Sequence, residues 1–459
     1  MTLQPPVDLN LDSSAMGTVT DLYQLTMMAG YDAAGMGEQP AVFELFVRKL
    51  PPRRSYLVFA GLEQAVAAIL NLRFDQDQIA ELRTWPTFAA IDPAWFDRLL
   101  DFQFTGNLWA VPEGTVVFAG EPLLRVEAKL PQAQLVETLL LGTLGYSTLV
   151  ASKAARIIEA AQGRGVIDFG ARRGHAIQAS FLAARSAFIA GFQGTSQVEA
   201  ARRLGIPALG TMAHSWVQAF GDERTAFEAF CRSFPRSTLL VDTYEILEGV
   251  LLAAAIEPPI QAIRIDSGDL LAESIQSRAI LDDFDRRGVE IVVSGDLDED
   301  SIARLVQAGA PVDRFGVGTE LITSGGAPAI SMVYKLVESG GVGRIKKSPG
   351  KRTYPLAKQV DRRSAADGTI VFDQVIQAAE TVEGEALLEQ VVQNGVLVRP
   401  WPSLAAIRER CTRQMSRLPA AIRSLNTAAT IPVRYSDLLQ REATRLGLEH
   451  STKPLVGGL

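Results

Sequence analysis

The spacing of apolar and polar positions changes twice along the chain. In the first third, helical spacing in TDLYQLTMMAGYDAAG and YLVFAGLEQAVAAIL flanks a strand-like run, AVFELFVRKL. Residues 105–130 form short alternating runs separated by Pro-Glu-Gly and Gly-Glu-Pro turns, and a long helical stretch follows to about residue 161. We therefore predict a polar lead-in over 1–19 and an N-terminal α/β domain with a helical connector over 20–164.

From about residue 165 the rhythm is different, because apolar β-branched runs end abruptly in polar or glycine-rich residues and helical segments follow them. The runs are VIDFG, IPALGTMAHS, STLLVDTY, AIRIDSGD, EIVVSGD and DRFGVGTE. Nearly continuous apolar strands that alternate with helices are typical of a parallel sheet covered by helices. Six such units in sequence favour a barrel over an open sheet, so we predict an α/β barrel over 165–350. Residues 351–459 contain β-like pieces, TIVFDQVI and GVLVRP, and a terminal helical region from about 403 to 446.

Composition restricts the class of protein. With 459 residues, 47 % hydrophobic and 21 % charged, the chain has an ordinary globular composition. The net charge of −7 and the interspersed charges argue against a nucleic-acid-binding surface. Cys231 and Cys411 lie far apart, so neither a zinc site nor a disulfide framework is expected. The N-terminus lacks the pattern of a secretory signal, and no run of about 18 apolar residues is free of charges. We expect a cytoplasmic protein with no membrane segment.

Polar residues that could take part in catalysis or binding follow the predicted strands, where α/β barrels carry their catalytic groups. Asp168 ends the first strand, and Arg172 and Arg173 follow in the next loop. A capped turn with a surface arginine pair would have the same sequence. This position therefore becomes informative only together with the other strand ends.

The second strand end carries His214, one of three histidines in the chain. A single histidine after a strand is more often a hydrogen-bonded structural residue than a catalyst. The neighbouring glycine, threonine and serine, including Thr211, indicate an open loop rather than a core. That setting favours a functional interpretation of His214.

The fourth strand end, the third with candidate chemistry, places Arg264, Asp266 and Asp269 within six residues. Two close carboxylates are costly unless a cation or hydroxyl groups neutralise them. A helix N-cap explains one aspartate but not the pair together with Arg264. Both aspartates suit Mg²⁺ or ribose hydroxyls, and the arginine suits a phosphate or a carboxylate.

Two glycine-containing loops follow the last two predicted strands, where barrels commonly bind phosphate. Gly295 and Asp296 lie in the first loop, and Gly318 and Thr319 lie in the second. Glycines there let backbone amides approach a phosphate, and the threonine adds a hydroxyl donor. A basic stretch over 344–352 is either a solvated loop or a flap over the phosphates. A phosphorylated pentose with a good leaving group fits this set of groups.

The motifs also resemble a known family. TDLYQLTMMAGY, FELFVRKLP, DFGARRGH, GTMAHSWVQAF, IRIDSGDL, VSGDLDE, FGVGTEL and MVYKLVE occur in the order found in nicotinate phosphoribosyltransferases, over essentially the full length. The resemblance implies a type II phosphoribosyltransferase fold: an irregular TIM-like α/β barrel plus a second α/β domain built from the N- and C-terminal parts. It also implies a homodimer with the active site at the interface, and neither nucleic acid nor a membrane as a partner.

What the resemblance implies for individual residues concerns nicotinate, phosphoribosyl pyrophosphate and ATP. His214 matches the histidine that ATP phosphorylates, and it is expected to be catalytic together with Asp266, which lies near the ribose. Mg²⁺ is expected on the pyrophosphate, with its protein ligands unknown. The other expected substrate-binding residues are Tyr23, which covers the pyridine ring across the dimer interface, Asp168, Arg172, Thr211, Arg264, Asp269, Gly295, Asp296, Gly318 and Thr319.

Two departures from the family pattern are visible. Gly142 and Gly145 stand in a helix where relatives usually carry asparagines. The usual Pro-Gly-x-Lys-Gln reads Pro-Leu-Ala-Lys-Gln here, with Leu356 in place of the glycine. Loss of that glycine could change the geometry of the flap or the handling of ATP.

Three alternative functions remain open at this point. Nicotinamide or quinolinate could replace nicotinate, although quinolinate needs a second anion site. A sugar-phosphate lyase or aldolase would carry a Schiff-base lysine at a strand end, and none of the six predicted ends has one. A catalytically inactive scaffold is the third alternative, and the intact His214, Arg264 and Asp266 argue against it.

Overall fold

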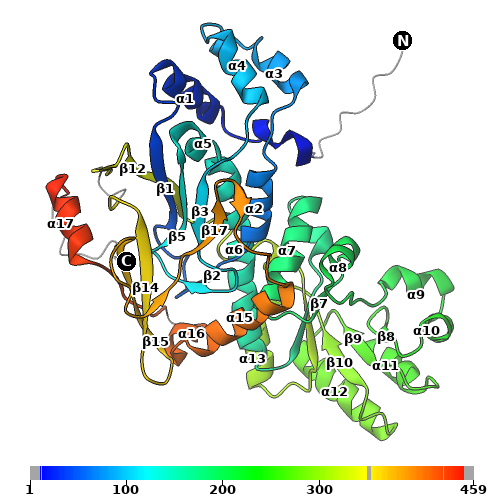
Figure 1. The fold of residues 1–459 in the computed structure, drawn as a ribbon. Coiled ribbons are helices and arrows are strands. Elements are labelled where there is room, and N and C mark those ends of the chain that lie inside the picture. The colour runs from blue at the N-terminus through cyan, green and yellow to red at the C-terminus, as the bar shows by residue number, and fades with distance from the viewer. Residues whose placement is uncertain (1–10, 12, 349–352, 427, 449–459) are drawn as a thin grey trace, which may run out of the picture.

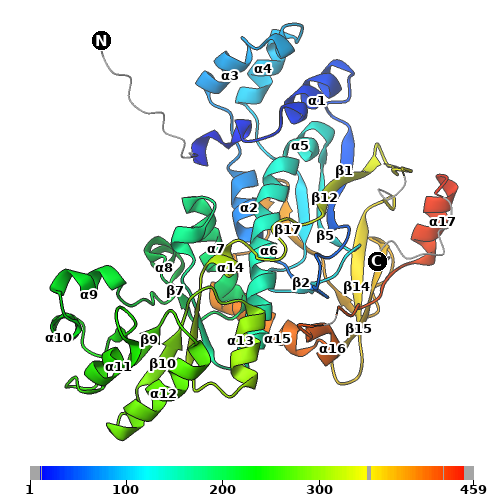
Figure 2. The ribbon, with the colours of Figure 1, turned by 180° about the vertical axis from the view of Figure 1, so that it is seen from behind.

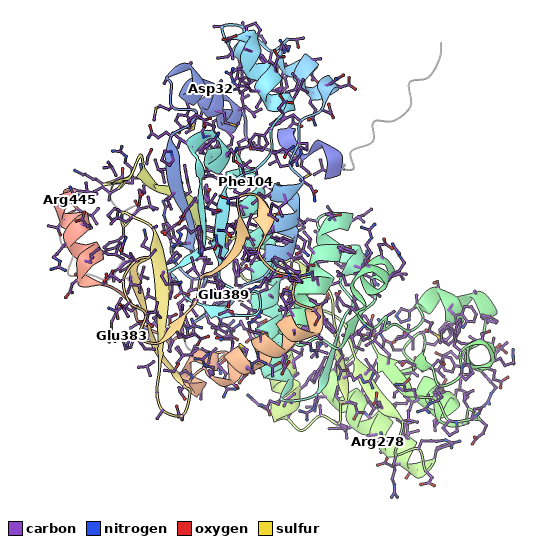
Figure 3. The ribbon with its side chains drawn as sticks, in the orientation of Figure 1. Asp32, Phe104, Arg278, Glu383, Glu389 and Arg445 are labelled. Carbon is purple, nitrogen blue, oxygen red and sulfur yellow. The ribbon has the colours of Figure 1, made fainter. Side chains whose placement is uncertain are left out.

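The computed structural model describes residues 11, 13–348, 353–426 and 428–448. Two bodies of different architecture lie at the two ends of the long helix α6 (Glu137–Ala161), as Figures 1 and 2 show. One body is built on a parallel sheet and the other on antiparallel sheets. Side chains fill the spaces between the elements in both bodies, and Figure 3 places Asp32 and Arg278 at opposite ends of the molecule.

The parallel sheet has six strands in the order β7-β6-β11-β10-β9-β8. The edge strands β7 and β8 do not pair with each other in the part of the chain that the structure describes, so the curled sheet is a half-barrel. The predicted α/β barrel architecture is confirmed in this open form. The strands are β6 (Gly165–Asp168), β7 (Gly194–Thr195), β8 (Thr238–Leu240), β9 (Ala262–Ile265), β10 (Glu290–Val293) and β11 (Arg314–Val317). The helices of this body are α7 (Ile177–Ala190), α8 (Val198–Leu204), α9 (His214–Phe220), α10 (Glu223–Ser233), α11 (Ile246–Ala254), α12 (Leu270–Asp283), α13 (Glu299–Gln307) and α14 (Thr319–Ile322).

One predicted strand is wrong. The run IPALGTMAHS forms only an isolated bridge, between Ala208 and Thr195, and the ladder strand at this edge is β7. Pro207 has no amide hydrogen to donate to a ladder. Its carbonyl instead accepts the amide of Thr195 at 3.0 Å. A side chain on Gly194 would lie 2.4 Å from that carbonyl, so the glycine allows the close approach.

The second body contains a seven-stranded sheet in the order β13-β12-β1-β5-β3-β17-β18, with a four-stranded sheet, β16-β14-β15-β19, beside it. Because β12 pairs with β1 and β17 pairs with β3, this body combines N-terminal and C-terminal segments, as expected. The last strand of the parallel sheet is β11, and the chain returns to the antiparallel body at β12. The strands are β1 (Pro40–Val47), β3 (Asn107–Ala110), β5 (Pro122–Lys129), β12 (Met332–Ser339), β13 (Val342–Gly343), β14 (Lys358–Ser364), β15 (Ile370–Gln377), β16 (Glu385–Ala386), β17 (Glu389–Gln393), β18 (Val396–Leu397) and β19 (Val433–Tyr435), with β2 (Leu57–Val58) and β4 (Val116–Val117) as a separate pair.

Helices cover this second body and close the chain. The terminal helical region is interrupted by β19, which pairs in parallel with β15. The helices are α1 (Leu22–Ala33), α2 (Leu62–Leu70), α3 (Gln76–Leu82), α4 (Pro93–Leu100), α5 (Leu130–Leu135), α15 (Leu404–Ser416), α16 (Ala420–Arg423) and α17 (Asp437–Arg445). Short 3-10 turns occupy Ser13–Thr18, Pro86–Phe88 and Ala171–Arg173.

Helix α6 belongs to both hydrophobic cores. Leu140 and Leu144 pack in the antiparallel body, whereas Val150 and Ala154 pack in the half-barrel. The segment Leu130–Ala161 is, among the described residues, long and apolar enough to cross a membrane, but 72 % of its most apolar window is buried inside the protein. Such burial is what the core helix of a folded domain shows.

Buried charges fix α6 against the half-barrel. Lys153 and Arg156 both reach Glu299, the first residue of α13, at 2.5 and 2.9 Å. Lys153 also lies 3.2 Å from Glu320 in α14. Removing one partner of a buried ion pair leaves an uncompensated charge and strongly destabilises the protein. This cluster therefore ties the positions of α13 and α14 to α6.

Candidate active site

Polar residues from all six parallel strands meet at one edge of the half-barrel. Because the strands are parallel, their carboxyl ends lie on the same side. The residues at those ends, or one or two positions after them, are Asp168, Thr195, Asp242, Asp266, Ser294 and Gly318. The structure therefore brings the predicted strand-end groups to a single edge.

Arg264 is the hub of this edge. Its Nε donates to Ser294 Oγ at 2.8 Å, and its Nη2 donates to Asp266 Oδ1 at 2.7 Å. Its Nη1 lies 3.4 Å from Thr211 Oγ1, and the guanidinium lies over the ring of Phe169, 5.3 Å from its centroid. The planar fork thus connects the loops after β9 and β10 with the loop before α9.

Asp266 is held as a carboxylate. Partial burial opposes its ionisation, but hydrogen bonds from Ser294 and Arg264 and the charge of nearby His214 outweigh this effect and lower its pKa. The Ser294 hydroxyl and Arg264 both donate to Oδ1. Oδ2 has no protein partner among the described residues, so one charged acceptor remains available to a ligand.

Asp242 supports this aspartate from behind, and the sequence analysis missed it. Its Oδ2 accepts the backbone amide of Asp266 at 3.0 Å and the Ser267 hydroxyl at 2.7 Å. Asp242 lies two positions after β8 and Asp266 directly follows β9, so the same signal, an aspartate after an apolar run, could have identified it.

The glycine loop after β10 closes against the same turn. Gly295 has a φ of +97°, and a Cβ there would lie 2.2 Å from the carbonyl oxygen of Asp266. Asp296 follows with a φ of +45° and an exposed side chain. The glycine is therefore needed for both its backbone conformation and its close contact.

His214 begins α9 and points one ring nitrogen at the loop after β8. Its Nδ1 lies 3.2 Å from Thr243 Oγ1, and either atom can donate the proton. Nε2 has no protein partner in the described part of the chain. Its contribution to the lowered pKa of Asp266 shows that the imidazole and this carboxylate share one region.

Asp168 lies at the other half of the edge and is 1 % exposed. Thr195 Oγ1 donates to its Oδ2 at 2.7 Å, and the amide of Gly170 donates to its Oδ1 at 2.8 Å. Burial raises its pKa against the effect of these two hydrogen bonds. Both oxygens already have protein partners, so Asp168 links the end of β6 to the end of β7.

The remaining predicted residues on this face are more exposed. Asp269 caps α12, because its Oδ1 accepts the amides of Leu271 and Ala272. Its role as a helix cap accounts for one of the two aspartates considered from the sequence. Gly318 and Thr319 begin α14, with Thr319 exposed, and Arg172 is exposed in the turn after β6.

Tyr23 is not brought to this edge within the chain. It lies on α1 in the antiparallel body, remote from α9–α12 in Figures 1 and 2. Its ring is 47 % exposed, and its hydroxyl donates to Glu137 Oε2 at 3.2 Å. Partial burial and the Glu137 carboxylate raise its pKa to about 12, so the phenol stays protonated.

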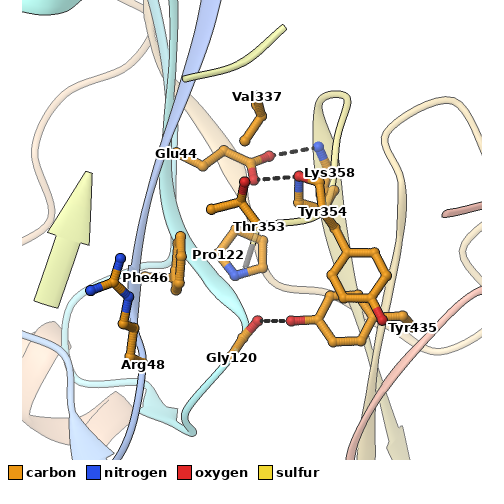
Figure 4. A pocket seen from close by; sticks show the side chains of 10 residues that line it. All are labelled: Glu44, Phe46, Arg48, Gly120, Pro122, Val337, Thr353, Tyr354, Lys358 and Tyr435. Carbon is orange, nitrogen blue, oxygen red and sulfur yellow. Dashed lines mark hydrogen bonds and ion pairs between the residues drawn. The ribbon is translucent and has the colours of Figure 1, made fainter. Parts of the chain in front are cut away.

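The described part of the basic stretch, residues 344–348, follows β13 in the antiparallel body. Its residues Lys351 and Arg352 lie outside the described residues. The chain after it borders a pocket, lined by Glu44, Phe46, Arg48, Gly120, Pro122, Val337, Thr353, Tyr354, Lys358 and Tyr435 (Figure 4). The rings of Tyr354 and Tyr435 stack with centroids 3.9 Å apart.

A buried lysine organises the turn that borders this pocket. Lys358 Nζ lies 2.8 Å from Glu44 Oε2 (Figure 4). It also donates to the carbonyls of Tyr354 at 2.9 Å and Leu356 at 2.7 Å. Leu356 has a φ of +67°, which is the left-handed conformation that favours glycine. The departure from the family pattern noted in the sequence therefore falls on a backbone that glycine would adopt without strain. At the other departure, Gly142 in α6, an added Cβ would meet nothing within 4 Å.

Among the described residues, no group of three or more histidine, cysteine, aspartate or glutamate side chains is arranged to hold a metal ion. The strand-end edge instead combines one open carboxylate oxygen, one arginine, one open imidazole nitrogen and two glycine loops. Such groups can bind an anionic sugar phosphate and act on it by positioning and charge stabilisation.

Three family models match most of the chain. Family models described as the nicotinate phosphoribosyltransferase N-terminal domain, the nicotinate phosphoribosyltransferase family and the nicotinate phosphoribosyltransferase C-terminal domain match residues 18–145, 165–360 and 370–442. A nicotinate phosphoribosyltransferase of Mycobacterium tuberculosis is 44 % identical over 93 % of this chain and 93 % of its own. The Bacillus subtilis nicotinate phosphoribosyltransferase is 35 % identical over 91 % of this chain and 92 % of its own.

Solved structures show the same fold. The crystal structure of human nicotinic acid phosphoribosyltransferase matches with a TM-score of 0.82 and 29 % identity, over 93 % of this chain and 99 % of that chain. A Pyrococcus furiosus structure described as nicotinate-nucleotide pyrophosphorylase matches with a TM-score of 0.74 and 27 % identity, over 90 % and 99 % of the two chains.

Proposed function

The chain belongs to the nicotinate phosphoribosyltransferase family, and we propose that it forms nicotinate mononucleotide and pyrophosphate from nicotinate and phosphoribosyl pyrophosphate. The observation that carries the proposal is the cluster of Arg264, Asp266 and Ser294 at the strand edge that also bears His214 and the two glycine loops. This reaction is the first step of NAD salvage from nicotinate.

In the proposed reaction the pyridine nitrogen attacks the anomeric carbon of the ribose while pyrophosphate leaves. Asp266 offers its free Oδ2 to ribose hydroxyls, and its negative charge stabilises the oxocarbenium-like state. Arg264 and Thr211 supply donors for the nicotinate carboxylate. The amides near Gly295, Asp296, Gly318 and Thr319 face the phosphates. Mg²⁺ bound to the pyrophosphate would neutralise charge on the leaving group.

His214 is proposed to couple the reaction to ATP as a phosphohistidine. Thr243 fixes Nδ1, which leaves Nε2 as the nitrogen that accepts the phosphoryl group. The Nε2 lone pair attacks the γ-phosphorus, the bond to ADP breaks, and water later hydrolyses the phosphohistidine. The phosphorylated ring carries negative charge beside the substrates, which changes their affinity between binding and release.

The position of Tyr23 supports a homodimer with a shared active site. Tyr23 and the described part of the basic stretch both lie on the antiparallel body, away from the strand edge of their own chain. A second copy is proposed to bring these groups to the edge, with Tyr23 over the pyridine ring. We propose a cytoplasmic enzyme whose partners are its small-molecule substrates and a second copy of the chain, with neither nucleic acid nor a membrane.

The direct test is synthesis of nicotinate mononucleotide from labelled nicotinate, with ATP present or omitted. Nicotinamide and quinolinate are assayed in parallel, and consumption of either one in place of nicotinate contradicts the proposed base. His214→Ala is expected to lose ATP stimulation and acid-labile phosphate incorporation. Unchanged stimulation in this variant would remove the histidine from the mechanism.

A further inference from the structure

A pocket of about 700 Å³ lies at the amino ends of the parallel strands, opposite the edge that carries the candidate active site. The charged residues of this amino-end pocket are four arginines and two acids: Arg164, Arg278, Arg287, Arg314, Glu290 and Asp313. Strand β10 rises about 3.3 Å per residue, so its first residue in the pocket and Ser294 at its other end are roughly 13 Å apart. An excess of arginine in a chain of net charge −7 is a local feature that favours an anionic ligand.

Neighbouring strands bring two of the arginines together. Arg314 begins β11 and is the ladder partner of Gly165, the first residue of β6. Arg164 therefore lies beside the start of β11, and its Nε donates to the carbonyl of Val312 at 3.0 Å. This hydrogen bond fixes the guanidinium, whose two Nη nitrogens have no protein partner among the described residues.

The other two arginines come from α12 and from the turn before β10. Arg278 Nη1 donates to the carbonyl of Val289 at 2.8 Å, and its Nε donates to Asp282 Oδ1 at 2.9 Å, so its charge is compensated. Arg287 is exposed, and its guanidinium has no hydrogen bond or ion pair within the described part of the chain. Arg164 and Arg287 thus both present guanidinium nitrogens to the pocket without an acidic partner.

The two acids of the pocket are engaged elsewhere. Glu290 Oε1 accepts from Arg314 Nη2 at 2.9 Å, and Asp313 Oδ2 accepts the amide of Ile291 at 2.7 Å. Planar guanidinium groups bind phosphate oxygens through paired, charge-assisted hydrogen bonds. The pocket therefore has both the charge and the room for a chain of phosphate groups.

We propose that the amino-end pocket is a second anion site, distinct from the active site, that binds a chain of phosphate groups. The chain is either free polyphosphate or the phosphates of a nucleoside triphosphate, because both present the same oxygens to arginine. Arg164 and Arg287 bind it with their unpaired nitrogens, and Arg314 exchanges Glu290 for the anion.

The Arg314–Glu290 pair connects this site to the candidate active site. Both residues also line a second pocket, of about 480 Å³, whose lining includes Phe169 and Thr211. When Arg314 turns to the bound anion, the Glu290 carboxylate is left uncompensated in this inner pocket. Its charge then disfavours a second carboxylate near Thr211. Binding of polyphosphate is therefore expected to weaken binding of nicotinate, an effect that rests on the proposed function.

The site is tested by isothermal titration calorimetry at 0.15 M salt with inorganic tripolyphosphate, and with β,γ-imido-ATP as the nucleotide probe. Arg287→Glu is expected to weaken binding of at least one probe about tenfold or more, because it replaces a donor to phosphate with a negative charge. At this salt concentration the Debye length is about 8 Å, so a charge change in the amino-end pocket is largely screened at the active site. Arg441→Glu, which reverses an exposed arginine on α17, is the matched control and should keep the wild-type isotherms.

The exposed Arg287 side chain has no partner to lose, so the melting curve of Arg287→Glu should match that of wild type. Equal affinities for the two probes would assign the site to phosphates alone, and tighter binding of β,γ-imido-ATP would assign it to a nucleotide. Isotherms of both probes that are identical in wild type and Arg287→Glu would overturn the second site.

The coupling is tested by measuring KM for nicotinate at saturating phosphoribosyl pyrophosphate, with and without tripolyphosphate. KM is expected to rise at least about fivefold in wild type and Arg441→Glu, and to stay constant in Arg287→Glu. Binding that depends on Arg287 without a change in KM would overturn the coupling through Arg314 and Glu290. A protein that forms no nicotinate mononucleotide but retains this binding contradicts only the proposed function.

Discussion

The carboxylate of Asp242 accepts the backbone amide of Asp266 at 3.0 Å, so the aspartate at the end of one strand holds the turn that presents the aspartate at the end of the next. The two residues lie in the loops after neighbouring strands of the half-barrel, β8 and β9. The position of the open Asp266 oxygen is therefore set by a residue that need not touch a ligand.

Asp242→Asn is expected to lower kcat/KM for phosphoribosyl pyrophosphate by about 10- to 100-fold, because a hydrogen bond to a charged acceptor contributes about 1.5–3 kcal/mol. Circular dichroism and a melting curve report whether the fold is retained. Ser301→Ala, which removes a hydroxyl from the start of α13 instead, provides a comparison away from the turn. A folded Asp242→Asn enzyme with unchanged kcat/KM would contradict the positioning of Asp266 by Asp242.

Ser294→Ala is expected to shift the acid limb of activity. The Ser294 hydroxyl is one of the groups that lower the pKa of Asp266, so its loss moves that pKa back up towards its usual range. The ionised carboxylate is present above its pKa and is lost as the pH falls through it, so the variant loses kcat/KM at a higher pH than wild type does. The pH dependence of kcat/KM, with folding checked at each pH, measures the shift, and coincident acid limbs would contradict it.

Gly295→Ala is expected to destabilise the protein by about 1–3 kcal/mol or more and to raise KM for phosphoribosyl pyrophosphate, since strain and a collision with the Asp266 carbonyl combine. Gly309→Ala separates the two causes, because Gly309 also has a positive φ, +76°, but an added Cβ meets nothing within 4 Å. The control should lose stability and keep its KM. Equal KM values for both variants would show that the β10 loop does not need its close contact with the turn.

Leu356→Val and Leu356→Gly are expected to differ in their free energy of unfolding. The left-handed backbone costs a non-glycine residue about 1–2 kcal/mol, and β-branching increases the cost. Wild-type Leu356 already carries the backbone cost, so the valine variant should lose stability through its β-branching in addition to about 0.8 kcal/mol for one buried methylene. Glycine relieves the strain but adds about 0.5–1 kcal/mol of unfolded-chain entropy, so that variant should stay within about 1 kcal/mol of wild type.

Leu404→Val, a half-buried leucine on an ordinary helical backbone, provides the reference for loss of one methylene. Urea unfolding gives the free energies for all three variants. If Leu356→Val and Leu404→Val lose the same amount, β-branching adds no measurable cost on the left-handed backbone at Leu356.

Lys358→Met is expected to cost about 3–5 kcal/mol, since it leaves Glu44 as a buried unpaired charge and removes the donor for the carbonyls of the turn. The double variant Glu44→Gln with Lys358→Met should recover part of this loss, because the unpaired charge is gone. Urea unfolding of both variants and of Glu44→Gln alone completes the cycle. An additive double variant would mean that the pair is not coupled.

Much of the half-barrel could be predicted from local pattern. Apolar runs that end in Asp168, Asp266 or Gly318 are strands whose carboxyl ends carry polar groups, and five of the six predicted runs contain such a strand. The sixth failed because β7 is only Gly194–Thr195, too short to leave a pattern, while the apolar run after it is interrupted by Pro207.

The roles of individual site residues depended on contacts that local pattern does not contain. Arg264 is a hub only because Ser294, thirty positions later, lies beside it in the sheet. Asp269 looked equivalent to Asp266, but helix α12 begins after it and uses its carboxylate as a cap. The placement of Tyr23 on the other body follows from the topology of the whole chain, which cannot be predicted from a short stretch of sequence.

The strand order has a consequence for biosynthesis. The first strand of the half-barrel, β6, pairs with the last, β11, so the edge that bears Asp168 and Gly318 is complete only after residue 317 has left the ribosome. The antiparallel sheet can be completed only later, because β1 and β3 need partners from residues 332–339 and 389–393. Strands with distant partners expose apolar faces until those partners arrive, and such intermediates are prone to aggregation. The antiparallel body therefore cannot finish folding until the half-barrel has been synthesised, so a nascent chain of this protein has no N-terminal domain that can complete its fold first.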